Sequence, residues 1–192
     1  MNYIENKVIE NQQFTDEIIE NTEYQDCVFT KCQFTDVKMI NCNFHNCEFH
    51  SCEWKLVKFE FCRMQNSSFY DCMLMGINWD ELQGRGNKSF PVDSMDNCVL
   101  RYNNFVQVNL TKFDFSTSSF HDCLFLECNL TKASFKSAMF KETSFSGCNL
   151  SEADFREAHK YSIDLQKNML KGAKFSLPEV VSLLDSLDII IE

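Results

Sequence analysis

Large apolar residues recur at every fifth position over most of the chain. Stepping by five from Phe14 to Trp79 meets fourteen of them in an unbroken series. A second series runs from Leu100 to Phe175, and Lys160 is its one exception. We call these residues the centres of the repeat. A period of five matches neither the 3.6 residues of a helical turn nor the two-residue alternation of a strand.

A second ordered set lies two positions before the centres, in what we call the inner slot. Its members are small: Cys27, Cys32, Val37, Cys42 and Cys47 begin the set, and Ala133, Ala138, Thr143, Cys148 and Ala153 belong to its second half. In an extended segment, residues two apart point to the same side. Centre and inner slot therefore both point inward, and the remaining residues turn the chain. Repeated turning in one sense predicts a solenoid with a filled interior.

The stretch "NCNFHNCEFHSCEW" at 41–54 raises the question of a metal site. Zinc ligands must converge on one point, whereas all eleven cysteines fall in the inner slot of the five-residue repeat. Free cysteine behaves as a small hydrophobe, which explains this placement, and His45 and His50 follow centres and should point outward. We therefore expect no metal site and no cofactor. The odd number of cysteines indicates a reduced, cytoplasmic protein, unless the cysteines form a disulfide framework.

The two series of centres are out of register between Trp79 and Leu100. The intervening segment contains Gly84, Gly86 and Pro91, which are turn-forming residues. We predict an insertion over about 80–93 at one edge of the solenoid. It is either a corner insertion without function or a binding surface. In the second case, the candidate partner-binding residues are Asp80, Glu81, Leu82, Arg85, Lys88, Phe90 and Pro91. A smaller irregularity, a local bulge, is expected around Lys160.

The pattern changes at both ends of the chain. Ile4 and Ile9 keep the spacing and predict an N-terminal capping strand within a repeat domain over 1–175. Ser176 and Glu179 fit a capping box, which begins a C-terminal segment, 176–192, with an apolar helical stripe and a short strand. This segment either seals the solenoid or pairs with a second copy, and we favour a two-fold homodimer. The candidate dimerisation residues are Val180, Leu183, Leu184, Leu187, Ile189, Ile190 and Ile191.

Charge narrows the range of functions. The formal net charge of −10 argues against direct nucleic-acid binding, which requires cations to replace counterions. Residues 1–30 hold seven acids and one base, and the candidate acidic surface there consists of Glu17, Glu20, Glu23 and Asp26. Solubility alone is the other reading of this acidity. We find no apolar run of membrane-spanning length, no signal peptide and no catalytic motif, so we expect neither a membrane protein nor an enzyme.

The stretches "CNLTKASFKSAMF" at 128–140 and "CNLSEADF" at 148–155 resemble the A(D/N)Lxx consensus of the pentapeptide-repeat proteins. The resemblance covers about 14–175 and implies an all-β fold, a right-handed quadrilateral β-helix with four pentads per coil. The thirty pentads counted here would form seven to eight coils, a rod of roughly 35 Å at about 4.8 Å per coil.

Within that family the chain resembles the topoisomerase-protecting branch, which includes Qnr-like quinolone-resistance proteins and microcin immunity proteins. The matching features are the opening "MNYIENKVI", the run "DCMLMGINWDEL" at 71–82, one mid-chain insertion and the terminal "LLDSLDIII". The resemblance implies an acidic, dimeric rod that binds DNA gyrase or topoisomerase IV and protects it from a drug or peptide toxin. The alternative is a structural or interaction solenoid with a different partner, because fold alone does not determine function.

Overall fold

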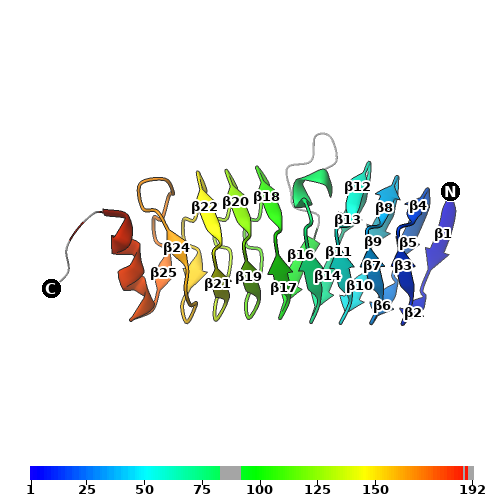
Figure 1. Cartoon of the computed structure of the whole chain (residues 1–192), viewed down its shortest axis with the longest axis horizontal. Coiled ribbons are helices and arrows are strands. Elements are labelled where there is room, and N and C mark those ends of the chain that lie inside the picture. The colour runs from blue at the N-terminus through cyan, green and yellow to red at the C-terminus, as the bar shows by residue number, and fades with distance from the viewer. Residues whose placement is uncertain (83–91, 188, 190–192) are drawn as a thin grey trace.

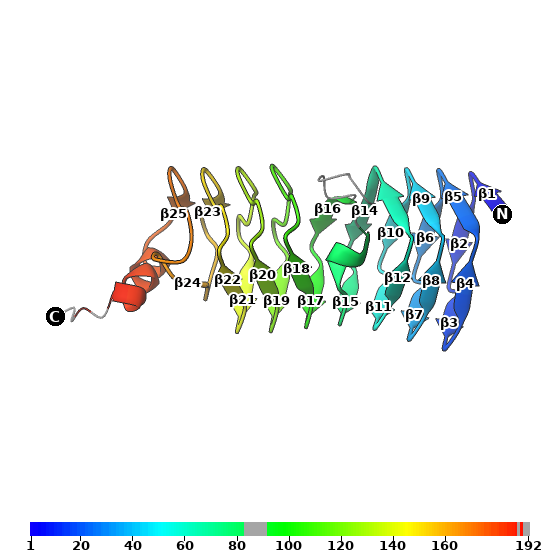
Figure 2. The same cartoon turned by 90° about the horizontal axis from the view of Figure 1, so that it is seen from above.

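The chain forms a parallel β-solenoid of about eight turns, with its two termini at opposite ends of a rod (Figures 1 and 2). The computed structural model describes residues 1–82, 92–187 and 189. Each strand pairs in parallel with the strand one coil further on, usually 20 residues later, as Phe29 does with Phe49. Four pentads therefore make one coil, and the strands stack into four faces. This confirms the solenoid expected from the five-residue period.

Faces 1 and 2 come first in each coil. Face 1 contains β1 (Asn2–Glu5), β5 (Thr22–Gln25), β9 (Asn43–His45) and β13 (Arg63–Gln65), and single bridges continue it through Asn109, Asn129, Asn149 and Met169. Face 2 contains β2 (Val8–Glu10), β6 (Val28–Thr30), β10 (Glu48–His50), β14 (Ser67–Tyr70), β16 (Val92–Asp96), β23 (Asp154–Phe155) and β25 (Lys174–Phe175).

Faces 3 and 4 complete each coil. Face 3 contains β3 (Gln13–Thr15), β7 (Gln33–Thr35), β11 (Glu53–Lys55), β15 (Met73–Met75), β17 (Val99–Arg101), β19 (Ser119–His121) and β21 (Met139–Lys141). Face 4 contains β4 (Ile18–Glu20), β8 (Lys38–Ile40), β12 (Lys58–Glu60), β18 (Asn104–Val106), β20 (Leu124–Leu126), β22 (Ser144–Ser146) and β24 (Ser162–Ile163). The 3₁₀ helix η1 (Trp79–Leu82) lies between β12 and β18, and η2 (Glu179–Leu187) follows β25.

The centres fill the interior of the rod with stacked rings. Phe29, Phe49 and Phe69 stack one above another on face 2, with ring centroids 4.8 and 4.6 Å apart. Rings on neighbouring faces meet edge to face, as Phe49 and Trp54 do at 5.1 Å. Offset stacks and edge-to-face pairs are the favoured geometries of aromatic rings. The centres of the first coil, which lie at the open end, are only partly buried.

The inner-slot side chains form hydrogen-bonded columns. All eleven cysteines are free and buried. The Cys52 thiol lies 3.4 Å from the carbonyl oxygen of Phe29 and accepts a hydrogen bond from the backbone N–H of Cys32, also at 3.4 Å. Ser67 does the same in another column, accepting from Cys47 N–H at 3.2 Å and donating to the Gln65 carbonyl oxygen at 3.1 Å. The slot thus selects a small residue, and its cysteine and serine members also form hydrogen bonds to the backbone.

Replacing Cys52 by alanine should lower the free energy of unfolding by about 1–3 kcal/mol, because the buried N–H of Cys32 loses its acceptor. Cys52→Ser should cost clearly less, since a hydroxyl already occupies the equivalent slot at Ser67. Urea denaturation followed by tryptophan fluorescence measures both variants. Equal losses for alanine and serine would show that the slot requires only the volume of sulfur.

The corners of the solenoid use the left-handed backbone conformation. At the regular non-glycine corners, the residue two after the centre has a φ of 50–63°. Asparagine and aspartate tolerate this conformation best after glycine, and Asn21 and Asn41 occupy one corner of successive coils. Their side chains are hydrogen-bonded to each other at 2.8 Å. Asparagine-rich corners therefore explain the turns of the repeat.

The insertion falls between face 4 and face 2. Leu74 pairs with Leu100 rather than with a residue 20 positions on, so this coil carries six additional residues. Leu82 and Val92, both inside the predicted insertion, are buried in the core. Both side chains are apolar and join the hydrophobic core of the solenoid. Residues 83–91, the middle of the predicted insertion, lie outside the described residues.

The irregularity around Lys160 is a compensated shift in register. Phe145 pairs with Ile163, only 18 residues later, whereas Asn149 bridges to Met169 at the regular spacing. Tyr161 and Ile163 are buried in place of the expected centres Lys160 and Leu165, and Leu165 is only partly buried. The shift keeps the lysine out of the core, because burying an unpaired ammonium group is costly.

Candidate functional site

Any functional site must lie on the exterior, because side chains fill the interior. Among the described residues, no group of three or more histidine, cysteine or carboxylate side chains could hold a metal ion. His50 lies 2.8 Å from the Glu48 carboxylate and stacks on Tyr70, while His159 lies 3.1 Å from Glu179. No helix in the described ranges is long and apolar enough to cross a membrane.

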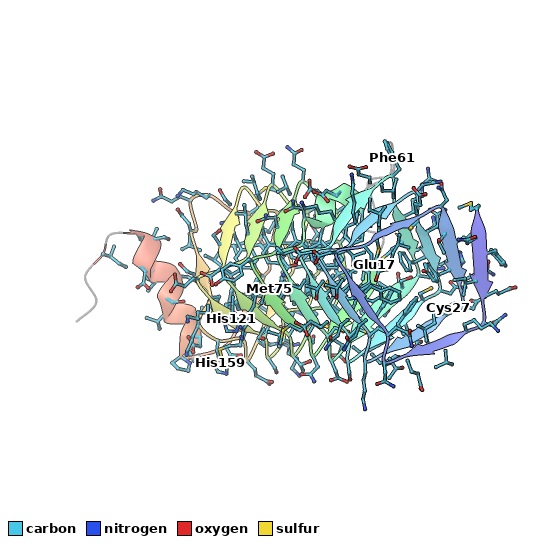
Figure 3. The ribbon with its side chains drawn as sticks, turned by 45° about the vertical axis from the view of Figure 1, so that its right-hand side comes forward. Glu17, Cys27, Phe61, Met75, His121 and His159 are labelled. Carbon is cyan, nitrogen blue, oxygen red and sulfur yellow. The ribbon has the colours of Figure 1, made fainter. Side chains whose placement is uncertain are left out.

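The thiols point into the shaft, as Cys27 does in Figure 3. Burial raises the pKa of Cys47 and of Cys123 to about 11, so both stay protonated at neutral pH. The neighbouring Cys62 thiol lowers the pKa of Cys42, but Cys42 is fully buried. The cysteines therefore act as packing residues.

The insertion begins at a well-anchored point. Trp79 and Leu82, at the two ends of η1, are buried in the core. Between them, Glu81 accepts hydrogen bonds from the backbone N–H of Phe59 at 3.2 Å and from the Asn78 side chain at 3.1 Å. These contacts tie η1 to β12. Of the seven candidate partner-binding residues, only Asp80 and Glu81 are exposed in the described chain.

Leu82 is wrong as a partner contact, because its side chain packs in the core. Its side chain belongs to the hydrophobic core and is not accessible to a partner. Arg85, Lys88, Phe90 and Pro91 lie outside the described residues.

Phe61 is a surface residue beside the insertion that the sequence reasoning missed. It occupies the corner that Asn21 and Asn41 occupy in earlier coils, with a φ of 55° and 80 % of the residue exposed. It points away from the rod (Figure 3). A bulky residue in the left-handed conformation costs roughly 1–2 kcal/mol. The sequence does mark this position, because positions 41 and 21, one and two coils earlier, are both asparagine.

The candidate acidic residues spread over two adjacent faces at the N-terminal end instead of forming one patch. Glu17 precedes β4 at the open end of the shaft, Glu20 ends β4 on face 4, and Glu23 lies in β5 on face 1. Asp26 follows at the corner between faces 1 and 2 and is half-buried. Glu17 and Glu20 are exposed, and Glu23 is half-buried. The candidate acidic surface therefore extends from the corner before face 4 to the corner after face 1.

Asp26 is held ionised by its neighbours. Its carboxylate accepts hydrogen bonds from Asn46 at 2.8 Å and Gln25 at 3.2 Å, and these lower its pKa. A depressed folded-state pKa stabilises the fold above the unfolded-state pKa, and that contribution is lost as the pH falls through the folded value. Asn46→Ala should move the pKa of Asp26 back up toward its ordinary value. Carboxyl ¹³C titration by NMR measures this, and an unchanged pKa would contradict the assigned cause.

The C-terminal η2 caps the last coil. Leu183 is 7 % exposed and belongs to the core, and Val180 packs against that core. Leu183 is therefore unavailable as a contact to a second copy, because it covers the end of the shaft. Val181 and Leu187 remain exposed, and Leu184 is half-buried. Ile189 is exposed and lies in no strand, and Ile190 and Ile191 are outside the described chain.

Comparisons with known proteins agree with this architecture. The family described as "Pentapeptide repeats (8 copies)" matches residues 21–53, and the "Pentapeptide repeat region" matches 118–182, together about half of the chain. No curated protein matches the sequence significantly.

Solved structures of QnrB1 show the same fold. Full-length QnrB1, a plasmid-mediated fluoroquinolone resistance protein, matches with a TM-score of 0.56 and 17 % identity over 95 % of this chain and 100 % of that chain. A trypsin-treated point variant of QnrB1 matches with a TM-score of 0.51 and 19 % identity over 100 % and 98 % of the two chains. HetL of the cyanobacterium Nostoc sp. strain PCC 7120 matches with a TM-score of 0.49 and 15 % identity over 88 % and 85 %.

Proposed function

Because the chain belongs to the pentapeptide-repeat proteins, we propose that it binds DNA gyrase or topoisomerase IV and protects it from a quinolone-type drug or a peptide toxin. This repeat family is not a known enzyme family. The observation that carries the proposal is a filled acidic rod interrupted by one anchored insertion. Its likeness in fold to QnrB1, a fluoroquinolone resistance protein, supports the proposal.

Electrostatics supports this proposal. A rod with a net charge of −10 presents carboxylates on its exterior. Such a surface can occupy a basic groove that normally holds DNA phosphates, and it attracts that groove over about one Debye length. Glu20 and Glu23 lie on either side of the corner between faces 4 and 1. Their carboxylates are suited to such a contact.

The insertion supplies the second part of the proposed surface. Glu81 fixes the start of the insertion to β12, and Phe61 offers an exposed ring at a neighbouring corner. An exposed aromatic residue beside a rigidly held segment is typical of an interaction site. We propose that the partner contacts this region in addition to the acidic residues.

The protein is proposed to act as a homodimer through η2. Val181, Leu187 and Ile189 form the exposed apolar part of the C-terminal segment. A two-fold contact would use the same residues on both copies. The dimer would then present two acidic rods extending from a central junction.

A supercoiling assay tests the function directly. Purified protein added to gyrase poisoned with a fluoroquinolone, or with a gyrase-directed peptide toxin, should restore supercoiling. A variant in which residues 83–91 are replaced by a glycine–serine segment of equal length keeps the buried Leu82 and Val92. It should retain the melting temperature and lose most of the protection. No rescue of gyrase or topoisomerase IV by the wild-type protein, against either poison, would refute the proposal.

A further inference from the structure

A second group of apolar residues lies on face 3 and at its corner with face 4. This central patch consists of Leu56, Met73, Met75, Val99 and Tyr102, contributed by three adjacent coils. Leu56 is 42 % and Tyr102 is 58 % exposed, Met73 is also exposed, and the other two are half-buried. The strands that carry the patch, β11, β15 and β17, are neighbours in face 3. The patch is therefore continuous along the rod.

Register fixes the arrangement of these side chains. Met73 pairs with Val99, and Met75 pairs with both Lys55 and Arg101 in the adjacent coils. The next row along the corner reads Leu56, Gly76 and Tyr102. The side chain of Leu56 covers Gly76, because a Cβ added there would lie 2.6 Å from Leu56 Cδ2. Two rows therefore run side by side along the rod. The row on face 3 places Met75 between two cations, and the row at the corner is apolar.

The backbone at this corner is unfavourable for the residues it carries. Leu56 has a φ of 54° and Tyr102 a φ of 56°, whereas aspartates occupy the same corner at Asp16, Asp36 and Asp122. Bulky residues in the left-handed region are outliers that persist where another requirement selects them. Core packing is not that requirement, since both side chains are exposed.

Charge indicates the kind of partner. The row that contains Met75 runs from Lys55 through Arg101 and His121 to Lys141, in register on β11, β15, β17, β19 and β21. In the described chain neither Lys55 nor Arg101 forms an ion pair. Partial burial, then the charges of Arg101 and Lys141, lower the pKa of His121, while Asp122 opposes them. This row is locally positive on an otherwise acidic rod.

We infer that the central patch binds an acidic segment of the partner protein that inserts a large apolar side chain between Lys55 and Arg101. The inference rests on the proposed topoisomerase partner and adds a surface distinct from the insertion. The acidic segment pairs with the two cations, and its apolar side chain covers Met75, Leu56 and Tyr102. Charged groups flanking an apolar anchor are a common design of protein interfaces.

The left-handed corner provides a sharp test. The double variant Leu56→Asn/Tyr102→Asn places a residue favoured by this backbone at both positions. Its melting temperature should equal or exceed that of the wild type, while its affinity for purified gyrase heterotetramer or topoisomerase IV should fall at least tenfold. Ser51→Asn is the matched control, because it places the same residue at the opposite edge of face 3 (φ of 52°). Its affinity should stay unchanged.

Charge reversal separates the possible occupants. Lys55→Glu/Arg101→Glu should also weaken binding, and added salt should weaken binding of the wild type. If the wild type binds neither topoisomerase, the proposed function and this inference both fail. If it binds and both double variants bind equally well, only the inference fails. If the wild type binds a DNA duplex of about 20 base pairs through Lys55 and Arg101, the occupant is nucleic acid, and the inferred protein segment is wrong.

Discussion

Replacing Phe135 by alanine is expected to lower the free energy of unfolding by about 3–5 kcal/mol. Its ring is fully buried and stacks on Phe115 at 5.1 Å and on Phe155 at 4.8 Å. It also meets neighbouring rings edge to face, including Phe125 and Phe145 at 6.0 and 5.9 Å. The cavity left by alanine would open in the middle of the rod, where coils pack on both sides.

Phe14→Ala is the matched control for this variant. Phe14 occupies the same kind of position in the first coil, but it is only partly buried, and among the described rings it stacks on Phe34 alone, at 4.8 Å. Phe14→Ala should lower the free energy of unfolding by less than half as much as Phe135→Ala. Urea denaturation followed through the buried Trp54 and Trp79 measures both. Equal losses would show that stability does not depend on position along the stack, contrary to nearest-neighbour packing in a solenoid.

Leu183→Asp is expected to destabilise the protein by about 3 kcal/mol or more. This leucine covers the last coil, and an aspartate would place a charge against the core on which Val180 and Phe175 also pack. Val181→Asp introduces the same charge two residues earlier, where the residue is 44 % exposed. The control should leave the unfolding of the monomer nearly unchanged.

The same pair of variants separates sealing from dimerisation. Light scattering coupled to size exclusion reports the oligomeric state, and thermal unfolding reports the fold. If η2 also forms a dimer contact, Val181→Asp should give a monomer that is still folded. A Leu183→Asp variant with wild-type stability would contradict the capping role of η2.

The regular part of the fold could be predicted from the sequence because each pentad solves the same packing problem. Once Phe29 and Cys27 are known to point inward, the pairing of Phe29 with Phe49 follows from the four pentads per coil that the resemblance to the repeat family implied. The solenoid, its filled interior and the buried cysteines were confirmed in this way. The five-residue period alone shows which side chains point inward, without any knowledge of contacts between distant residues.

The exceptions could not be predicted because they depend on the neighbouring coils. Leu82 was assigned to a partner surface, yet the coil around the insertion has space for it in the core. Tyr161 and Ile163 replace Lys160 and Leu165 through two shifts that cancel, and a period count detects only the mismatch at Lys160. Phe61 stayed unnoticed because the five-residue period describes the inward positions and places few demands on the corners.

The two ends of the rod have different consequences for self-association. β1, β2, β3 and β4 are each the outermost strand of their sheets, so the first coil presents a complete ring of unpaired backbone groups, an arrangement that promotes polymerisation into filaments. Exposed Glu5, Glu10 and Glu20 form an acidic collar on this ring, so two such ends repel each other. At the opposite end, η2 covers the last coil and blocks stacking of another copy there. The acidic collar and η2 together therefore oppose end-to-end polymerisation of the rods.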